Sequence, residues 1–272
     1  MADVMEERIR SIQRCAGWCF ALGSIFVSIA ILVYPAFPEV NKTDLVLSQI
    51  TRASGESWIA LHALMIVGFF LVTVGFSALA FLLHLKGSSG SASIVATSAL
   101  LGGGLWIAFL CAEIYAYRFL ANLYGIDPGG ATMLFSIIWF WKLAALVVAG
   151  ICEFLAVFFA GLAVAKRDVV PAWLGVLGAL FALIGTLYYA MEFWMSMGTG
   201  AAIQPMQSPI ARYAIGLPLQ LWLLVVGALL LRGYFMSMPV KRVAPARRGG
   251  ATEPMPGDAP EKPVPPPQIY PG

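Results

Sequence analysis

The chain has 272 residues, of which 60% are hydrophobic and 11% are charged, and its mean hydropathy is +0.83. Soluble domains carry roughly 25% charged residues, so this composition excludes an ordinary soluble protein and predicts one that lies in the lipid bilayer. The net charge is only +3, and its cationic residues cluster near the two ends of the chain. Nucleic acid is therefore not an expected partner.

Apolar segments of membrane-crossing length recur along the chain. A transmembrane helix needs about 20 mostly apolar residues, and six segments meet this requirement. The predicted spans are residues 16–37, 58–83, 93–120, 132–165, 171–196 and 210–236. We therefore predict an all-α membrane protein, a bundle of six transmembrane helices. Three consecutive glycines, Gly102 to Gly104, mark the third span as closely packed or kinked.

The Lys and Arg residues predict the orientation of the bundle. If the N-terminus is cytoplasmic, the cytoplasmic side receives Arg8, Arg10, Arg14, Lys86, Lys166, Arg167, Arg232, Lys241, Arg242, Arg247, Arg248 and Lys262. The other side receives Lys42, Arg52, Arg118 and Arg212. Since cytoplasmic loops carry the excess of basic residues, both termini are expected in the cytoplasm, with residues 1–15 as a cytoplasmic N-terminal segment.

The last part of the chain differs in composition from the spans. Residues 237–272 are rich in Pro, Gly and charge and show no apolar period. Such a segment buries too little apolar surface to fold alone. It is predicted to be a disordered, Pro-rich cytoplasmic tail.

Two ionisable residues lie at similar depth in neighbouring spans. Glu113 lies roughly 10 Å along the helix axis from the outer end of the third span, and Lys142 lies roughly 15 Å from the outer end of the fourth. Ionisable groups at membrane depth are costly and usually pair inside the bundle. We therefore predict an ion pair between Glu113 and Lys142.

Further polar residues are expected in the same outer layer. The candidate ligand-pocket residues are His62, Glu113, Tyr117, Arg118, Lys142, Tyr188, Glu192 and Arg212. They predict an outward-facing pocket for a small polar molecule, a lipid headgroup or a cation. The alternative is a satisfied network of ion pairs that fixes how the helices pack, with the residues at helix ends reaching the bilayer surface.

Glu153 is the one acid near the inner half of the bundle. It follows Lys142 by eleven residues and so lies on nearly the same helix face, roughly 16 Å deeper. The two residues could line a proton or ion path, or Glu153 could bond to a neighbouring hydroxyl or indole.

Catalytic and cofactor signatures are missing from the chain. It contains no GxSxG and no HExxH, so no catalytic residues are assigned. His62, Glu113 and Glu192 are residue types that bind zinc, but without a paired His motif no metal is predicted. The only two histidines, His62 and His84, are expected at opposite ends of one span, so no haem or other cofactor is predicted.

Three apolar stretches carry a resemblance to a known group of proteins. They are "WIALHALMIVGFFLVTVGFSAL" at 58–79, "PAWLGVLGALFALIG" at 171–185 and "LPLQLWLLVVGALLLRGY" at 217–234. They resemble uncharacterised bacterial multi-helix integral membrane proteins, grouped as domains of unknown function. The resemblance implies a bacterial inner-membrane protein and implies no activity.

Three functions are compatible with these features. The first is a protein that binds or moves a small molecule, ion or lipid through its polar outer layer. The second is a non-catalytic accessory or scaffold protein whose spans bind another membrane complex, with the tail as a tether. An intramembrane enzyme ranks third.

Overall fold

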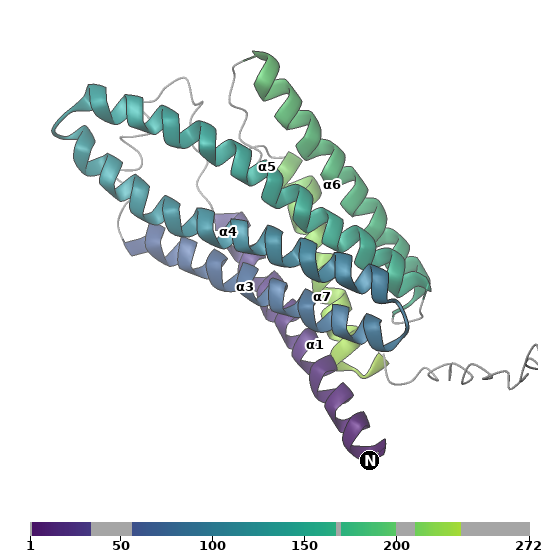
Figure 1. Cartoon of the computed structure of the whole chain (residues 1–272). Helices are drawn as coiled ribbons and strands as arrows, with labels where there is room; N and C mark the ends of the chain where they lie inside the picture. Colours follow the sequence, from purple (N-terminus) through teal and green to yellow (C-terminus); the bar gives the residue numbers. More distant parts are fainter. Residues whose placement is uncertain (1, 34–55, 167–169, 200–209, 235–272) are drawn as a thin grey trace, which may run out of the picture. The chain divides into compact units, whose positions relative to one another are not determined.

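The computed structural model describes residues 2–33, 56–166, 170–199 and 210–234, and nearly all of these residues lie in helices (Figure 1). The helices are α1 (Ala2–Val33), α3 (Glu56–Leu85), α4 (Ser89–Tyr124), α5 (Pro128–Lys166), α6 (Ala172–Thr199), the π-helix η1 (Ile210–Gly216) and α7 (Leu217–Leu231). Six of them are long and apolar enough to cross a membrane. The prediction of a multi-pass, all-helical membrane protein is confirmed, and its orientation across the membrane stays a prediction.

The helices extend beyond several of the predicted spans. α1 begins at Ala2, fourteen residues before the predicted start of the first span, and α4 begins inside the predicted loop at Ser89. α5 starts at Pro128 because Asp127 caps it: the backbone N–H of Gly130 donates to Asp127 Oδ1 at 3.0 Å. An acidic cap followed by Pro at the first helical position is a strong helix start.

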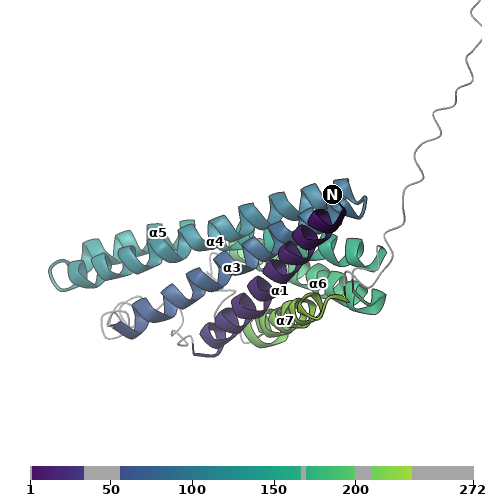
Figure 2. The ribbon, with the colours of Figure 1, turned by 90° about the horizontal axis from the view of Figure 1, so that it is seen from below.

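Each helix packs against the next, and the last packs back against the first. α3 packs against α4, α4 against α5 and α5 against α6, while α1 packs against both α3 and α7. α7 and η1 also contact α6, which completes the order. Figures 1 and 2 show α3, α4 and α5 side by side, with α1 next to α3. We name the two ends of the bundle by their turns: the α3–α4 end and the α4–α5 end.

Small residues let these helices touch backbone to backbone. A Cβ added to Gly161 of α5 would lie 2.6 Å from the carbonyl oxygen of Gly175 in α6, closer than real Cβ atoms approach. Comparable contacts join Gly23 to Gly68 between α1 and α3, and Gly17 to Gly227 between α1 and α7. In lipid, where helices gain nothing from hiding apolar surface, such close packing is a main source of association.

Two buried side chains fasten α7 to its neighbours. Trp222 Nε1 donates to the carbonyl oxygen of Leu174 in α6 at 2.8 Å. Gln13 Nε2 of α1 donates to the carbonyl oxygen of Leu230 at 2.7 Å. Both acceptors are backbone carbonyls, so the contacts also fix the register of the helices.

The π-helix η1 ends at Gly216, two residues before a proline. Pro218 is the second residue of α7, has no N–H to donate and carries a ring that clashes with the carbonyl four residues earlier. A wider turn relieves such a clash, and π-helical turns of this kind are often found at functional sites. The sequence therefore explains why the last span is divided at this point.

The outer surface of the helices suits lipid contact. Large apolar side chains such as Phe70, Leu101 and Trp194 are exposed, as expected where the surroundings are acyl chains. Contacts divide the chain into two units, Met1–Met238 and Pro239–Gly272. The second unit contains most of the predicted disordered tail and lies outside the described residues.

Candidate functional site

A buried histidine and a buried glutamate meet between α3 and α4. Both side chains are withdrawn from solvent, His62 with 0% and Glu113 with 4% of its surface exposed. His62 Nε2 lies 3.3 Å from Glu113 Oε2, near the long limit of hydrogen bonding. His62 Nδ1 lies 2.9 Å from the carbonyl oxygen of Trp58, one helical turn earlier.

These two contacts fix the number of protons that the pair holds. A carbonyl oxygen only accepts, so Nδ1 of His62 must carry a proton and donate it to Trp58. A hydrogen bond between Nε2 and Glu113 then needs one further proton, which resides on either the imidazole or the carboxyl group. The two arrangements have the same total charge. The His62–Glu113 pair is therefore a proton-sharing pair in a setting with little water.

Aromatic rings surround this pair. The ring of Trp58 lies 4.1 Å from the imidazole of His62, centroid to centroid, and 6.0 Å from the ring of Tyr117. Tyr117 in turn lies 6.2 Å from Phe135 of α5. The rings keep bulk water from the pair and hold the imidazole in place.

Glu113 also lines a small cavity between α4 and α5. Its volume is about 20 Å³, and aromatic and aliphatic side chains such as Phe109, Ile138 and Trp141 form its walls. A space of about 10–15 Å³ is the minimum for one water molecule. The cavity is therefore no larger than about one water molecule, and a larger ligand would require these side chains to move.

A second polar group lies between α5 and α6. Glu153 and Glu192, with 9% and 5% of their surfaces exposed, both act electrostatically on the buried Tyr189, as does Tyr188. The Tyr188 and Tyr189 rings lie 6.0 Å apart. The structure therefore places Glu153 near the α6 residues that include Glu192.

Two carboxylate oxygens in this second group have no hydrogen bond. Neither Glu153 Oε1 nor Glu192 Oε2 finds a partner among the described residues. The indole of Trp106 faces Glu153 as a hydrogen-bond donor, although its Nε1 meets no acceptor at full hydrogen-bond geometry among the described residues. Buried polar atoms are nearly always bonded, so Glu192 Oε2 is the atom of this group that best suits an additional polar occupant.

The other three predicted pocket residues, Arg118, Lys142 and Arg212, do not add to either polar group as the structure describes it. Arg118 is exposed near the α4–α5 end. Lys142 lies in α5 and Arg212 in η1, but their side chains lie outside the described part of the chain, so the Glu113–Lys142 ion pair stays a prediction. Within the described ranges, no group of three His, Cys, Asp or Glu side chains is arranged to hold a metal ion.

Comparisons with known proteins do not assign the chain to a family. No family model, curated protein or solved structure matches the chain. The resemblance to uncharacterised bacterial membrane proteins therefore stays a prediction, and the function must be argued from the site itself.

Some residues of the site were not anticipated from the sequence. Trp58 precedes His62 by four residues, a spacing that places the two on one helix face and could have indicated their contact. Trp106 gave no signal, because a single polar atom in an apolar segment has many possible neighbours.

Proposed function

We propose that the protein is a multi-pass inner-membrane protein that binds or moves a small molecule, ion or lipid, in a transporter-like manner. The observation that carries the proposal is the buried His62–Glu113 pair. Ionisable residues inside a membrane bundle are costly and typically belong to substrate, ion or proton pathways.

The second polar group supports the same proposal. Glu153, Tyr188, Tyr189 and Glu192 place additional protonatable side chains in the bundle, and Glu192 Oε2 meets no hydrogen-bond partner among the described residues. A purely structural network would be expected to satisfy this atom. An unbonded acceptor is better explained by an occupant that donates a hydrogen bond to it.

Native mass spectrometry of the mildly solubilised protein tests this function. We expect a discrete added mass on the wild type that is absent from the Glu113→Gln, Glu192→Gln double variant, because glutamine keeps the size of the side chain and removes its charge and its exchangeable acid proton. The matched control is Glu6→Gln, Glu7→Gln, which removes two exposed carboxylates from α1 and should retain the added mass. Identical bare spectra from equally folded proteins would contradict the proposal and favour a structural ion-pair network.

We propose further that both termini lie in the cytoplasm of a bacterial cell. The excess of Lys and Arg on one side supports this orientation. In a variant with all four cysteines replaced, Ile126→Cys at the α4–α5 end should react with a membrane-impermeant maleimide in intact cells. Gly90→Cys at the α3–α4 end, where no atom lies within 4 Å of an added Cβ, should react only after the inner membrane is permeabilised. The opposite pattern would reverse the orientation.

The scaffold alternative depends on the tail. Residues 237–272 lie outside the described part of the chain, so a partner complex bound through the tail stays a prediction.

A further inference from the structure

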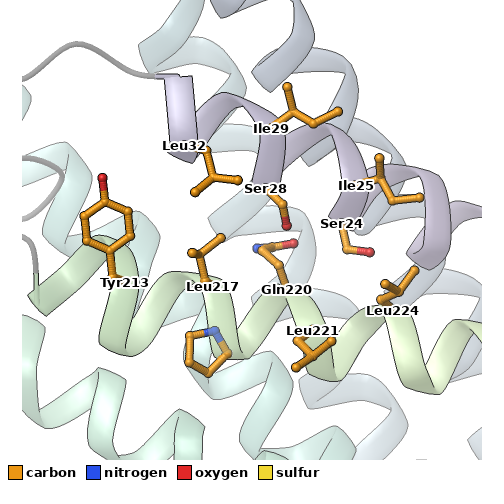
Figure 3. A pocket seen from close by; sticks show the side chains of 11 residues that line it. Ser24, Ile25, Ser28, Ile29, Leu32, Tyr213, Leu217, Gln220, Leu221 and Leu224 are labelled. Carbon is orange, nitrogen blue, oxygen red and sulfur yellow. The ribbon is translucent and has the colours of Figure 1, made fainter.

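A groove runs between α1 and α7 (Figure 3), and its described lining includes no residue of the two polar groups above. Its volume is about 480 Å³, and its apolar walls are Ile25, Ile29, Leu32, Leu217, Leu221 and Leu224. The positions of Ser24 and Leu32 are separated by about 12 Å along α1. Both helices belong to candidate membrane spans, and Leu32 and Leu221 are 58% and 60% exposed. The groove therefore opens toward the lipid.

One buried polar side chain lies in this apolar groove. Gln220 has only 4% of its surface exposed, and its Oε1 makes no hydrogen bond with any described residue. Figure 3 shows Gln220 reaching from α7 toward Ser24 and Ser28 of α1. An amide oxygen in an apolar setting is costly when it is left unbonded.

The neighbouring serine does not satisfy Gln220. Ser24 Oγ donates to the carbonyl oxygen of Phe20 at 2.6 Å and lies 3.1 Å from that of Ala21. A hydroxyl has one proton, and that of Ser24 is engaged with its own helix. Ser28, the other serine that lines the groove, also makes no hydrogen bond to Gln220 Oε1. The groove thus presents an acceptor to which no described residue donates.

These features define the chemistry of an occupant. The exposed apolar walls favour a molecule that enters from the bilayer with an apolar body. Among the described residues that line the groove there is no Asp, Glu, Lys or Arg, so an ionic headgroup gains no charge partner from them. The unbonded atom is an acceptor, so the occupant needs a donor, and a hydroxyl group is the neutral donor that crosses apolar surroundings at the lowest cost.

We propose that the α1–α7 groove binds an apolar membrane molecule that carries a hydroxyl group, and that this hydroxyl donates a hydrogen bond to Gln220 Oε1. The site lies at the junction of η1 and α7, and Pro218, the second residue of α7, is one of its lining residues. It is separate from the His62–Glu113 pair and does not depend on the function proposed for that pair.

Photo-labelling with two matched probes tests this site. The first probe is a long-chain alcohol with a diazirine in its chain, and the second is its methyl ether, which has the same chain and no donor. With the protein reconstituted in liposomes, we expect the alcohol to label residues 24–32 and 213–224 about fivefold more than the ether does. This ratio is the difference in binding that one net hydrogen bond gives. Gln220→Leu should reduce labelling by the alcohol to the level of the ether.

A second variant tests the groove independently of Gln220. Ile29→Trp places a larger side chain at the mouth of the groove and should lower labelling by both probes, even if Gln220→Leu fails to fold. Equal labelling of the wild type by alcohol and ether would overturn the proposal, because the groove would then bind by apolar packing alone. Labelling concentrated on other helices would overturn it as well.

Discussion

The Gly102→Leu substitution is expected to prevent stable folding, whereas Gly104→Leu, two residues away in the same helix, is expected to be tolerated. A Cβ at position 102 would lie 2.9 Å from the backbone nitrogen of Glu153 and 3.0 Å from the carbonyl oxygen of Ala149. These are backbone atoms of α5, which cannot move aside without separating the two helices. Overpacking of this kind typically costs about 1–3 kcal/mol and sometimes more, and a leucine side chain adds three further carbons beyond Cβ.

Gly104 provides the matched control for this prediction. No atom lies within 4 Å of a Cβ added there, and leucine forms helices better than glycine by somewhat less than about 1 kcal/mol. Unfolding by SDS, followed by circular dichroism, should therefore show an unchanged or slightly higher midpoint for Gly104→Leu and a large loss for Gly102→Leu. Equal midpoints for the two variants would show that α4 and α5 do not touch at Gly102.

The sequence predicts the helices well because membrane burial imposes a strong local requirement. Only a helix satisfies its backbone hydrogen-bonding groups within one segment in lipid. A long apolar run in a membrane protein is therefore expected to form a helix. The exact ends are harder to predict. Ser89 begins α4 inside a stretch that looks like a flexible loop, and α1 continues to Ala2 through charged residues that have no need of lipid.

The packing of the helices could not be predicted in the same way. Most of these helices are apolar on all sides, so no polar face indicates which side meets lipid and which side meets protein. Gly102, Gly103 and Gly104 illustrate the difficulty, because they are identical in sequence but differ in their surroundings. Gly102 contacts α5, Gly103 contacts Thr73 of α3 and Gly104 contacts neither.

The candidate site was partly predictable for a geometric reason. The rise of 1.5 Å per residue fixes the depth of a side chain along its helix, so His62 and Glu113 could be assigned to one layer. Rotation about the helix axis is not fixed by the sequence, so their direct contact could not be foreseen. Glu153 was instead separated from Glu192 by its expected depth in the inner half, whereas in the structure both act on Tyr189.

The second large effect is expected at the His62–Glu113 pair. His62→Leu removes the imidazole that shares a proton with Glu113 and leaves a buried carboxyl group without this partner. Breaking a buried pair by removing one member is costly, whereas replacing both members by apolar residues is often nearly neutral. We therefore expect His62→Leu to be clearly destabilising and the double variant His62→Leu, Glu113→Leu to recover part of the loss. His84→Leu is the control, because His84 is exposed and its replacement should change stability by less than about 0.5 kcal/mol.

The coupling free energy between His62 and Glu113 tests the central claim most directly. It is obtained from the unfolding free energies of the wild type, the two single leucine variants and the double variant, measured in the same SDS titration. Contact through a shared proton predicts a coupling of about 1–3 kcal/mol, with the double variant more stable than the sum of the single losses implies. Strictly additive losses would contradict the account, because they would mean that the two side chains do not interact inside the bundle.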